Sequence, residues 1–302
     1  MAGESTEVRV DVEGRVLRLT NLEKVLHPGT GTTKAEVLQH YASVAPLLLP
    51  LLRGRCVTRI RWPHGVGGPS FFEKNAPAGT PSWVRVVEVG DGVRFPMVED
   101  LATLTWLVNL SAIELHVPQW RVDDGGAVLP PDRLVVDLDP GEPAGLGECA
   151  HVALAVRDRL SARDASFETV PVLSGSKGIH VYADLTGRAD EFPDSDAVTR
   201  LARALAEELQ RAAPTSVTAS MAKQRRRGKV FVDWSQNSAS KTTLSPWSLR
   251  GREHPTCAVP VSWTEVEALA ADPLALEQVT LADVPERAYA AIGAGFPLFP
   301  SP

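Results

Sequence analysis

The stretch that decides the fold is Leu134-Val135-Val136-Asp137-Leu138-Asp139-Pro140-Gly141. An apolar run leads into two carboxylates, and side chains alternate along a β-strand, so Asp137 and Asp139 share one face. Two neighbouring carboxylates at a strand end repel each other unless a cation lies between them. Oxygen ligands favour Mg²⁺ or Mn²⁺. The stretch therefore predicts a buried strand that ends in a metal site, with two acids in an exposed turn as the alternative.

Apolar periodicity around this stretch predicts an α/β or α+β fold with a mixed central sheet. Strands are expected at residues 113–117, 133–139, 167–173, 179–183 and 229–234, and helices at residues 101–110, 149–160 and 196–212. A capping-box pattern from Thr33 to Glu36 begins a further helix. After Pro255 the pattern weakens, and residues 263–269 and 281–292 are expected to form short helices that wrap the body.

Composition excludes several classes of protein. The chain has 302 residues, with 44% hydrophobic and 23% charged residues, which is typical of globular proteins. Its three cysteines are too few and too far apart for a disulfide framework or a zinc site. Residues 1–10 are polar and acidic, and there is no run of about 18 apolar residues. We therefore expect no signal peptide, no membrane span and a cytoplasmic location.

Charge is unevenly distributed along the chain. The net charge of −6 argues against a generic nucleic-acid binder. Residues 223–252, however, hold eight Lys and Arg against one Asp, and a second basic cluster consists of Arg53, Arg55, Arg59 and Arg61. An acidic protein with concentrated basic stripes can bind polyanions through them. A solvated charged face is the alternative.

Two further segments carry residues suited to chemistry. Asp233 lies in a β-branched and aromatic run, where its charge requires a metal or a salt bridge. Residues 174–178, Ser-Gly-Ser-Lys-Gly, predict a turn whose backbone amides cradle a phosphate, although the P-loop pattern is absent. His180 follows this turn; a lone histidine on a strand is more often structural, but this one could contact phosphate. Together, three carboxylates, a phosphate-type turn and basic stripes indicate two-metal nucleotidyl transfer.

The same motifs resemble a known family. Asp-Leu-Asp-Pro at 137–140, Ser-Gly-Ser-Lys-Gly-Ile-His at 174–180 and Val-Phe-Val-Asp-Trp-Ser-Gln-Asn at 230–237 are similar to motifs I, II and III of the archaeo-eukaryotic primase superfamily. More narrowly, the chain resembles the polymerase domain of bacterial LigD-type ligases, of actinobacterial type. Matching stretches also occur at 20–26, 31–34, 71–74, 114–120 and 240–250. The resemblance implies a primase-like fold in one compact unit, with flanking helices and a second β layer.

The resemblance also implies a division of the chain and a function. Residues 1–18 would be an N-terminal extension, 19–256 the primase-polymerase catalytic domain, and 257–302 a C-terminal wrapping segment or tail. The activity would be template-dependent nucleotide addition that fills gaps and extends 3′ ends at double-strand breaks in non-homologous end joining. Ribonucleotides would be preferred. The partners would be DNA ends or gapped duplexes with a 5′-phosphate, Ku and a DNA ligase, in the bacterial nucleoid.

Individual residues acquire roles by the same resemblance. Two ions, Mn²⁺ or Mg²⁺, would be bound by Asp137, Asp139 and Asp233. The NTP or dNTP would be held by His116, Ser174, Ser176, Lys177, His180, Gln236, Lys241 and Arg250. The 5′-phosphate would be bound by Asn21, Lys24 and Lys34, template bases would stack on Phe71 and Phe72, and Arg226 would approach the template or a synapsed end. Lys34 also follows a helix cap, where free backbone amides attract anions.

Some features depart from the family pattern or leave alternatives open. Ile60 stands where many relatives have a basic residue, and no Lys-x-Asp-Gly adenylation motif of a ligase occurs. The chain is therefore either a stand-alone polymerase or a domain of a larger ligase. Two alternative hypotheses for the function are a primase-polymerase that acts in other repair or priming, and a non-catalytic module that bridges DNA ends. A metal-dependent glycosyltransferase would explain the Asp-x-Asp pair but not the basic stripe.

Overall fold

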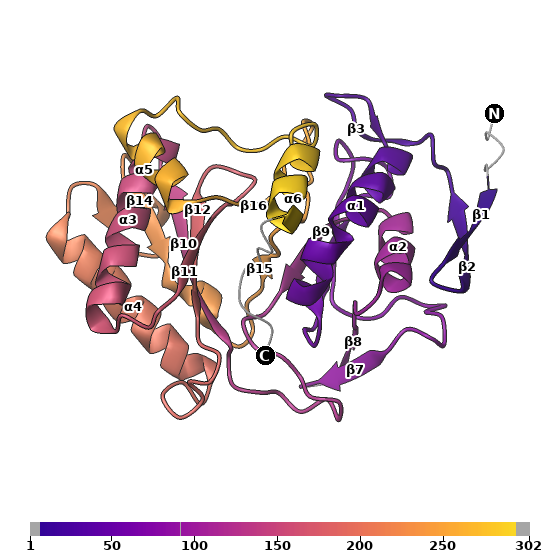
Figure 1. Ribbon diagram of the computed structural model, residues 1–302, viewed down its shortest axis with the longest axis horizontal. Coiled ribbons are helices and arrows are strands. Elements are labelled where there is room, and N and C mark those ends of the chain that lie inside the picture. The colour runs from indigo at the N-terminus through magenta and orange to yellow at the C-terminus, as the bar shows by residue number, and fades with distance from the viewer. Residues whose placement is uncertain (1–6, 91, 294–302) are drawn as a thin grey trace.

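Two sheets organise the protein, for which a computed structural model describes residues 7–90 and 92–293 (Figure 1). The larger sheet has the order β13-β14-β10-β12-β11-β16, with the decisive strand β10 (Arg133–Pro140) near its middle. Its other strands are β11 (Thr169–Leu173), β12 (Ile179–Asp184), β13 (Val217–Thr218), β14 (Val230–Asp233) and β16 (Val259–Pro260). Most neighbours are antiparallel, while β13 and β14 are parallel, so the sheet is mixed as predicted.

Helices cover the larger sheet on the left-hand side of Figure 1. These helices are α3 (Leu146–Arg163), α4 (Ser195–Ala212) and α5 (Trp263–Ala271). α3 packs on β10 and β12, and α5 packs on α3. The apolar face of α4 buries Val198, Leu205 and Leu209, the stripe that its periodicity predicts. α3 begins three residues before the predicted start at 149, because the Glu148 carboxylate caps the backbone of Gly145.

The smaller sheet has the order β15-β9-β5-β6 and occupies the other half of the molecule with α1 (Lys34–Leu52) and α2 (Leu101–Asn109). Its strands are β5 (Thr58–Arg61), β6 (Phe71–Glu73), β9 (Ala112–Val117) and β15 (Thr243–Leu244). The predicted capping box of α1 is confirmed: the Thr33 side chain accepts from Glu36 N, and the Glu36 carboxylate accepts from Thr33 N. One apolar core extends across both sheets, so the halves fold as one unit.

Hairpins and short helices complete the structure. β1 (Glu7–Val12) and β2 (Arg15–Thr20) pack on α2, β3 (Val25–His27) pairs with β4 (Thr32–Thr33), and β7 (Val86–Val89) pairs with β8 (Val93–Pro96). Two 3₁₀ turns are η1 (Lys223–Arg225) and η2 (Trp234–Asn237). Among the described residues, no helix has the length and apolar character needed to cross a bilayer.

The segment after Thr256 contacts both halves of the molecule. β16 forms one edge of the larger sheet, and α6 (Val284–Gly293) packs on α1 (Figure 1). The two predicted short helices are therefore present as α5 and α6. Residues 294–302 of the predicted wrapping segment lie outside the described residues.

Candidate functional site

Three aspartates lie at the same end of β10 and β14, where these strands run side by side. Antiparallel pairing places Asp137 directly opposite Asp233, and Asp139 lies two residues further along the same strand. Burial raises the pKa of Asp137 well above its ordinary value, and the negative charges of Asp139 and Asp233 raise it further. Desolvation and the charge of Asp233 likewise raise the pKa of Asp139. The end of β10 therefore holds carboxylates that destabilise one another.

The hydrogen bonds of these aspartates differ. Asp233 Oδ1 accepts from Ser235 N at 3.0 Å and Ser235 Oγ at 2.6 Å, and its Oδ2 accepts from Gln236 Nε2 at 3.0 Å. No described residue donates a hydrogen bond to the Asp139 carboxylate. Nor do any three Asp, Glu, His or Cys side chains of the described residues converge on one ion position. The donor set nevertheless fits a hard divalent cation, since it is all oxygen and a cation would offset the repulsion.

The turn between β11 and β12 lies against the end of β10. Ser174 Oγ accepts from the backbone amides of Ser176 and Gly178, both at 3.2 Å. A Cβ at Gly178 would lie 1.9 Å from the Leu138 carbonyl oxygen, so only glycine permits this approach. The prediction of a cradle of free amides is therefore wrong for these two amides, because Ser174 already binds them.

Side chains supply the positive charge around this turn. Arg250 Nε donates to Ser174 O at 2.9 Å, and Arg252 Nη2 donates to Ser176 Oγ at 2.5 Å. A pocket of about 350 Å³ opens here, lined by Gly175, Ser176, Arg252, Glu253, His254 and Thr256. Lys177 is exposed and pairs with Glu142 at 2.9 Å. Arg252 was not among the predicted nucleotide contacts, although its spacing from Arg250 across Gly251 was a signal that could have identified it.

The two predicted histidines lie on different strands, and each has a carboxylate of a different residue beside it. His180 is opposite Asp137 in the β10–β12 pairing, and its Nε2 lies 3.5 Å from Asp137 Oδ1. Burial lowers the pKa of His180 to about 3, so its ring is neutral at pH 7. His116 Nε2 lies 2.7 Å from Glu114 Oε2, and Glu114 Oε1 accepts from Gly251 N at 2.9 Å. The prediction omitted Glu114, which connects His116 to the Arg250 segment.

The basic loop after α4 is fixed to the end of β10 through Arg226. The Arg226 guanidinium lies 3.6 Å from the Phe231 ring centroid, and its Nη2 donates to Met221 O at 2.9 Å. A Cβ at Gly141 would lie 2.0 Å from Arg226 O, and Gly141 N donates to Lys229 O at 2.8 Å. The charge of Arg226 opposes the rise in the pKa of Asp139. Arg226 thus belongs to the acidic site as well as to the basic loop.

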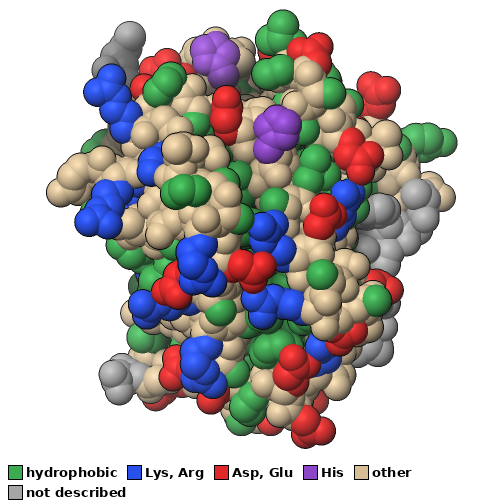
Figure 2. All heavy atoms as spheres, turned by 90° about the vertical axis from the view of Figure 1, so that its left-hand side faces the viewer, with side chains coloured by type: hydrophobic (Ala, Val, Ile, Leu, Met, Phe, Trp, Pro, Cys, Tyr) green, Lys and Arg blue, Asp and Glu red, His purple; other side chains and the backbone are tan. Residues whose placement is uncertain are grey.

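Other cations of this loop face outward. A hollow of about 550 Å³ is lined by Gln210, Arg211, Pro214, Thr218, Gln224, Arg225, Arg227 and Lys229. Within the described part of the chain, none of its four cations forms an ion pair. Figure 2 shows the side of the molecule that carries α4, where several basic groups have acidic neighbours and others stand apart at one margin. The hollow is therefore a polyanion-binding candidate, as the stripe at 223–252 predicts.

The prediction that the second basic cluster is such a surface is wrong for Arg55, Arg59 and Arg61, whereas Arg53 is exposed. Arg55 and Arg59 are almost completely buried. Arg55 forms a two-pronged ion pair with Asp132 at 2.6 and 2.7 Å, while Arg59 and Arg61 share Glu73 at 2.5 and 2.9 Å. Alternation along β5 turns Arg59 inward, and the carboxylates of other segments neutralise it. Arg55, Arg59 and Arg61 therefore stabilise the fold, because carboxylates of the chain already offset their charges.

The predicted 5′-phosphate residues gather at the start of α1. Lys34 is only 3% exposed, and its Nζ donates to Thr20 O at 2.5 Å. Burial and the charge of Lys24 lower the pKa of Lys34 to about 8. Lys24 Nζ donates to Pro63 O, and Asn21 is exposed with a positive φ of 54°.

The helix-terminus argument for this phosphate site is wrong. The amides of Lys34 and Ala35 donate to Lys24 O and Leu22 O at 2.8 and 2.9 Å, so they are not free. What remains is a pair of lysines, Lys24 and Lys34, that form no ion pair with any residue of the described part of the chain.

Two exposed aromatics extend the site along the smaller sheet. Phe71 and Phe72 lie on its edge strand β6 and are 48% and 59% exposed. Large apolar side chains at such exposure are typical of binding surfaces. Lys241 is also exposed, whereas Gln236 bonds to Asp233.

Comparisons with known proteins agree on one family. The family model for the LigD primase-polymerase domain matches residues 33–293. The chain is 45% identical over 285 residues to the multifunctional non-homologous end joining DNA repair protein LigD of Mycobacterium tuberculosis (strain H37Rv), covering 92% of the chain and 36% of that protein. It is 33% identical over 252 residues to the bifunctional non-homologous end joining protein LigD of Bacillus subtilis, covering 83% of the chain and 40% of that protein. The chain thus spans well under half the length of these relatives.

A solved structure shares the fold. The polymerase domain from Mycobacterium tuberculosis Ligase D, in complex with DNA, superimposes with a TM-score of 0.84 at 45% identity. The match covers 92% of this chain and 96% of that one. The predicted primase-like α/β fold is therefore confirmed.

Proposed function

The chain belongs to the LigD primase-polymerase domain family, and on that premise we propose that it adds nucleotides to DNA 3′ ends on a template during non-homologous end joining. The observation that carries the proposal is the meeting of Asp137 and Asp233 across paired strands, beside the turn at 174–178. A pure end-binding module would gain nothing from carboxylates that raise each other's pKa. The match at 45% identity over 92% of the chain supports the same reaction class.

Asp137, Asp139 and Asp233 are the residues that would hold two divalent ions, Mn²⁺ or Mg²⁺. Bound ions would activate the attacking 3′-hydroxyl and neutralise the triphosphate. The chain itself contributes orientation. Ser235 and Gln236 fix the Asp233 carboxylate through three hydrogen bonds, and neutral His180 lies beside Asp137 without adding charge.

The incoming nucleotide is proposed to lie with its phosphates at the turn and its sugar toward His116. Ser176 and Arg252 line the pocket beside the turn, and Ser174, Lys177 and Arg250 belong to the turn or bond to it. Together they supply hydroxyls and cations suited to a polyphosphate. Gln236, His180 and Lys241 complete the predicted set. Glu114 orients His116 at 2.7 Å, and that ordered pair is the proposed basis for a preference for ribonucleotides.

DNA is proposed to contact both halves of the molecule. Unpaired cations of the basic loop would neutralise backbone phosphates, and exposed Phe71 and Phe72 would stack on template bases. Arg226 would approach the template or a synapsed end, and Asn21, Lys24 and Lys34 would bind a 5′-phosphate across the gap. Ku and a DNA ligase activity, from the same or another chain, are the proposed partners, in the cytoplasm at the nucleoid.

Primer extension on a gapped duplex with a 5′-phosphate tests the proposal. Wild type should extend the primer with Mn²⁺ or Mg²⁺ and incorporate NTPs faster than dNTPs. Asp137→Asn should reduce extension by about a thousandfold, since a lost metal interaction costs several kcal/mol in the transition state. Asp158→Asn, on the exposed face of α3, is the matched control. Extension by Asp137→Asn at the wild-type rate would contradict the assignment, and synthesis only on primer-free single strands would favour a priming role.

A further inference from the structure

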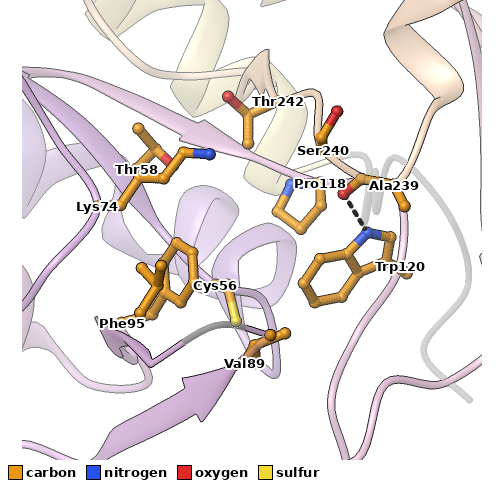
Figure 3. Close-up of a pocket in the computed structure, with 12 residues that line it drawn as sticks. Cys56, Thr58, Lys74, Val89, Phe95, Pro118, Trp120, Ala239, Ser240 and Thr242 are labelled. Carbon is orange, nitrogen blue, oxygen red and sulfur yellow. Dashed lines mark hydrogen bonds between the residues drawn. The ribbon is translucent and has the colours of Figure 1, made fainter.

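A further cavity lies in the smaller-sheet half, away from the three aspartates (Figure 3). It has a volume of about 370 Å³ and opens between strand β5, Lys74 after β6, the hairpin β7–β8, the segment after β9 and the loop at 239–242. Five segments of the sequence therefore build it. None of its lining residues belongs to the predicted metal, nucleotide or 5′-phosphate sites.

Two aromatic side chains flank this cavity. Figure 3 shows Phe95 and Trp120 on opposite sides, with Cys56 and Val89 at its base. Trp120 is held in place, because its Nε1 donates to Ala239 O at 3.0 Å. Phe95 comes from the second strand of the hairpin, where it packs with Cys56 and Trp120 in a small apolar cluster. A space between two ordered aromatic rings suits a planar ring as its occupant.

Two polar groups that line the cavity lack side-chain partners among the residues that the structure describes. Thr58 is 0% exposed, yet no described residue forms a hydrogen bond with its Oγ1. A buried hydroxyl without a partner is costly, so a ligand that binds it gains affinity. Lys74 also lines the cavity, and within the described part of the chain it has no acidic partner and no Asp or Glu contributes to the lining. The ligand should therefore pair hydrogen-bonding groups and a nearby negative charge with a flat apolar ring.

The cavity also continues the surface proposed for DNA. β6 carries the exposed Phe71 and Phe72, and Lys74 follows β6 directly. Thr58 is opposite His116 in the β5–β9 pairing, so the cavity lies near the proposed nucleotide site without sharing its contacts. A strand that stacks on Phe71 and Phe72 would pass the cavity opening, with its phosphates within the reach of Lys74.

We propose that this cavity receives one unstacked nucleobase of the template strand, between Phe95 and Trp120. The base would bind the Thr58 hydroxyl through a ring nitrogen or an exocyclic group, and Lys74 would bind the adjoining phosphate. The inference rests on the proposed function only in taking DNA as the ligand; it assigns a recognition site that neither catalysis nor 5′-phosphate binding requires. A base held there would fix the strand position relative to the gap.

The test measures binding of gapped DNA in the absence of metal and nucleotide, so that it is independent of catalysis. An abasic site is moved through each unpaired template position, and the dissociation constant is determined by fluorescence anisotropy. For wild type, one position should show about tenfold weaker binding when abasic, equivalent to about 1.4 kcal/mol. Val89→Trp, which fills the cavity, and Ser240→Trp, which covers its opening, should bind intact and abasic DNA equally.

Val16→Trp, at an exposed valine of β2, adds the same bulk elsewhere and should keep the tenfold difference. Thr58→Val keeps the volume and removes the hydroxyl, so it should fold normally and reduce the difference. The proposal is overturned if no template position shows a difference in wild type, or if the difference survives in a folded cavity-filling variant. If Val89→Trp does not fold, the comparison of intact with abasic DNA is made with Ser240→Trp instead. Loss of primer extension alone would overturn the proposed function but not this site.

Discussion

The two ends of strand β10 hold charge in opposite ways. At its start, Asp132 is bound by Arg55 and Arg121 at 2.6 Å, and its pKa is below the ordinary value because these cations outweigh the cost of burial. At its end, burial and like charges raise the pKa of Asp137 and Asp139. Charges offset within the chain stabilise the fold, whereas charges left without partners indicate a ligand. The predictions below test that distinction.

Removing the compensated charge should have the largest effect on folding. Asp132→Ala should lower the free energy of unfolding by about 3–5 kcal/mol, because the buried Arg55 guanidinium loses its partner. Urea denaturation measures the change. Asp164→Ala breaks the more exposed pair with Arg188 and should cost less than about 1 kcal/mol. Equal losses in the two variants would show that the start of β10 is not a structural charge centre.

Removing an uncompensated charge should have the opposite sign. In the presence of a chelator, Asp137→Asn should raise the free energy of unfolding by about 1–2 kcal/mol, since it relieves repulsion and the desolvation of a carboxylate. Asp158→Asn, largely exposed, should change it by less than about 0.5 kcal/mol. A clear destabilisation by Asp137→Asn would mean that this aspartate serves the fold.

The lysine pair at α1 offers a smaller test of the same rule. Wild type should bind a gapped duplex with a 5′-phosphate about tenfold more tightly than the unphosphorylated duplex, equivalent to about 1.4 kcal/mol. Lys24→Ala/Lys34→Ala should lose this preference and keep its affinity for unphosphorylated DNA. Fluorescence anisotropy with both duplexes measures it. If the preference persists in the double variant, the phosphate binds elsewhere.

The pH dependence of the Lys34 site follows from its lowered pKa of about 8. In the unfolded chain the pKa of a lysine is about 10.4. Between the folded and the unfolded pKa, the unfolded chain therefore binds more protons than the folded chain. The contribution of Lys34 to the free energy of unfolding rises with pH in this range. Its charged form is therefore costly below pH 8, where an anion compensates it. The 5′-phosphate preference, measured by the same anisotropy assay, should be full between about pH 7 and pH 8, where the phosphate carries its second charge, and decline above pH 8.

The sequence was a sufficient guide where the signal is local. Strand alternation placed Asp137 and Asp139 on one face, and the capping box placed the start of α1. The sequence was an insufficient guide where contacts with distant segments decide whether a side chain is buried or a backbone amide is free. Arg59 resembles Arg53 in sequence, but Glu73 and Asn75 bind it from another segment. The amides of α1 donate to the carbonyls of Leu22 and Lys24, and the cavity beside Trp120 needs five segments, so no local pattern predicts either.

Gly141 and Gly178 give the end of β10 a particular evolutionary constraint. Each brings a neighbouring segment against the strand by backbone contact alone, at Arg226 O and Leu138 O respectively. The strand and its two flanking loops are therefore as close as backbone contact allows. A side chain at Gly141 or Gly178 would force them apart. Divergence of substrate choice among such proteins would have to proceed through side chains that line the site, such as Glu114, while its width stays constant.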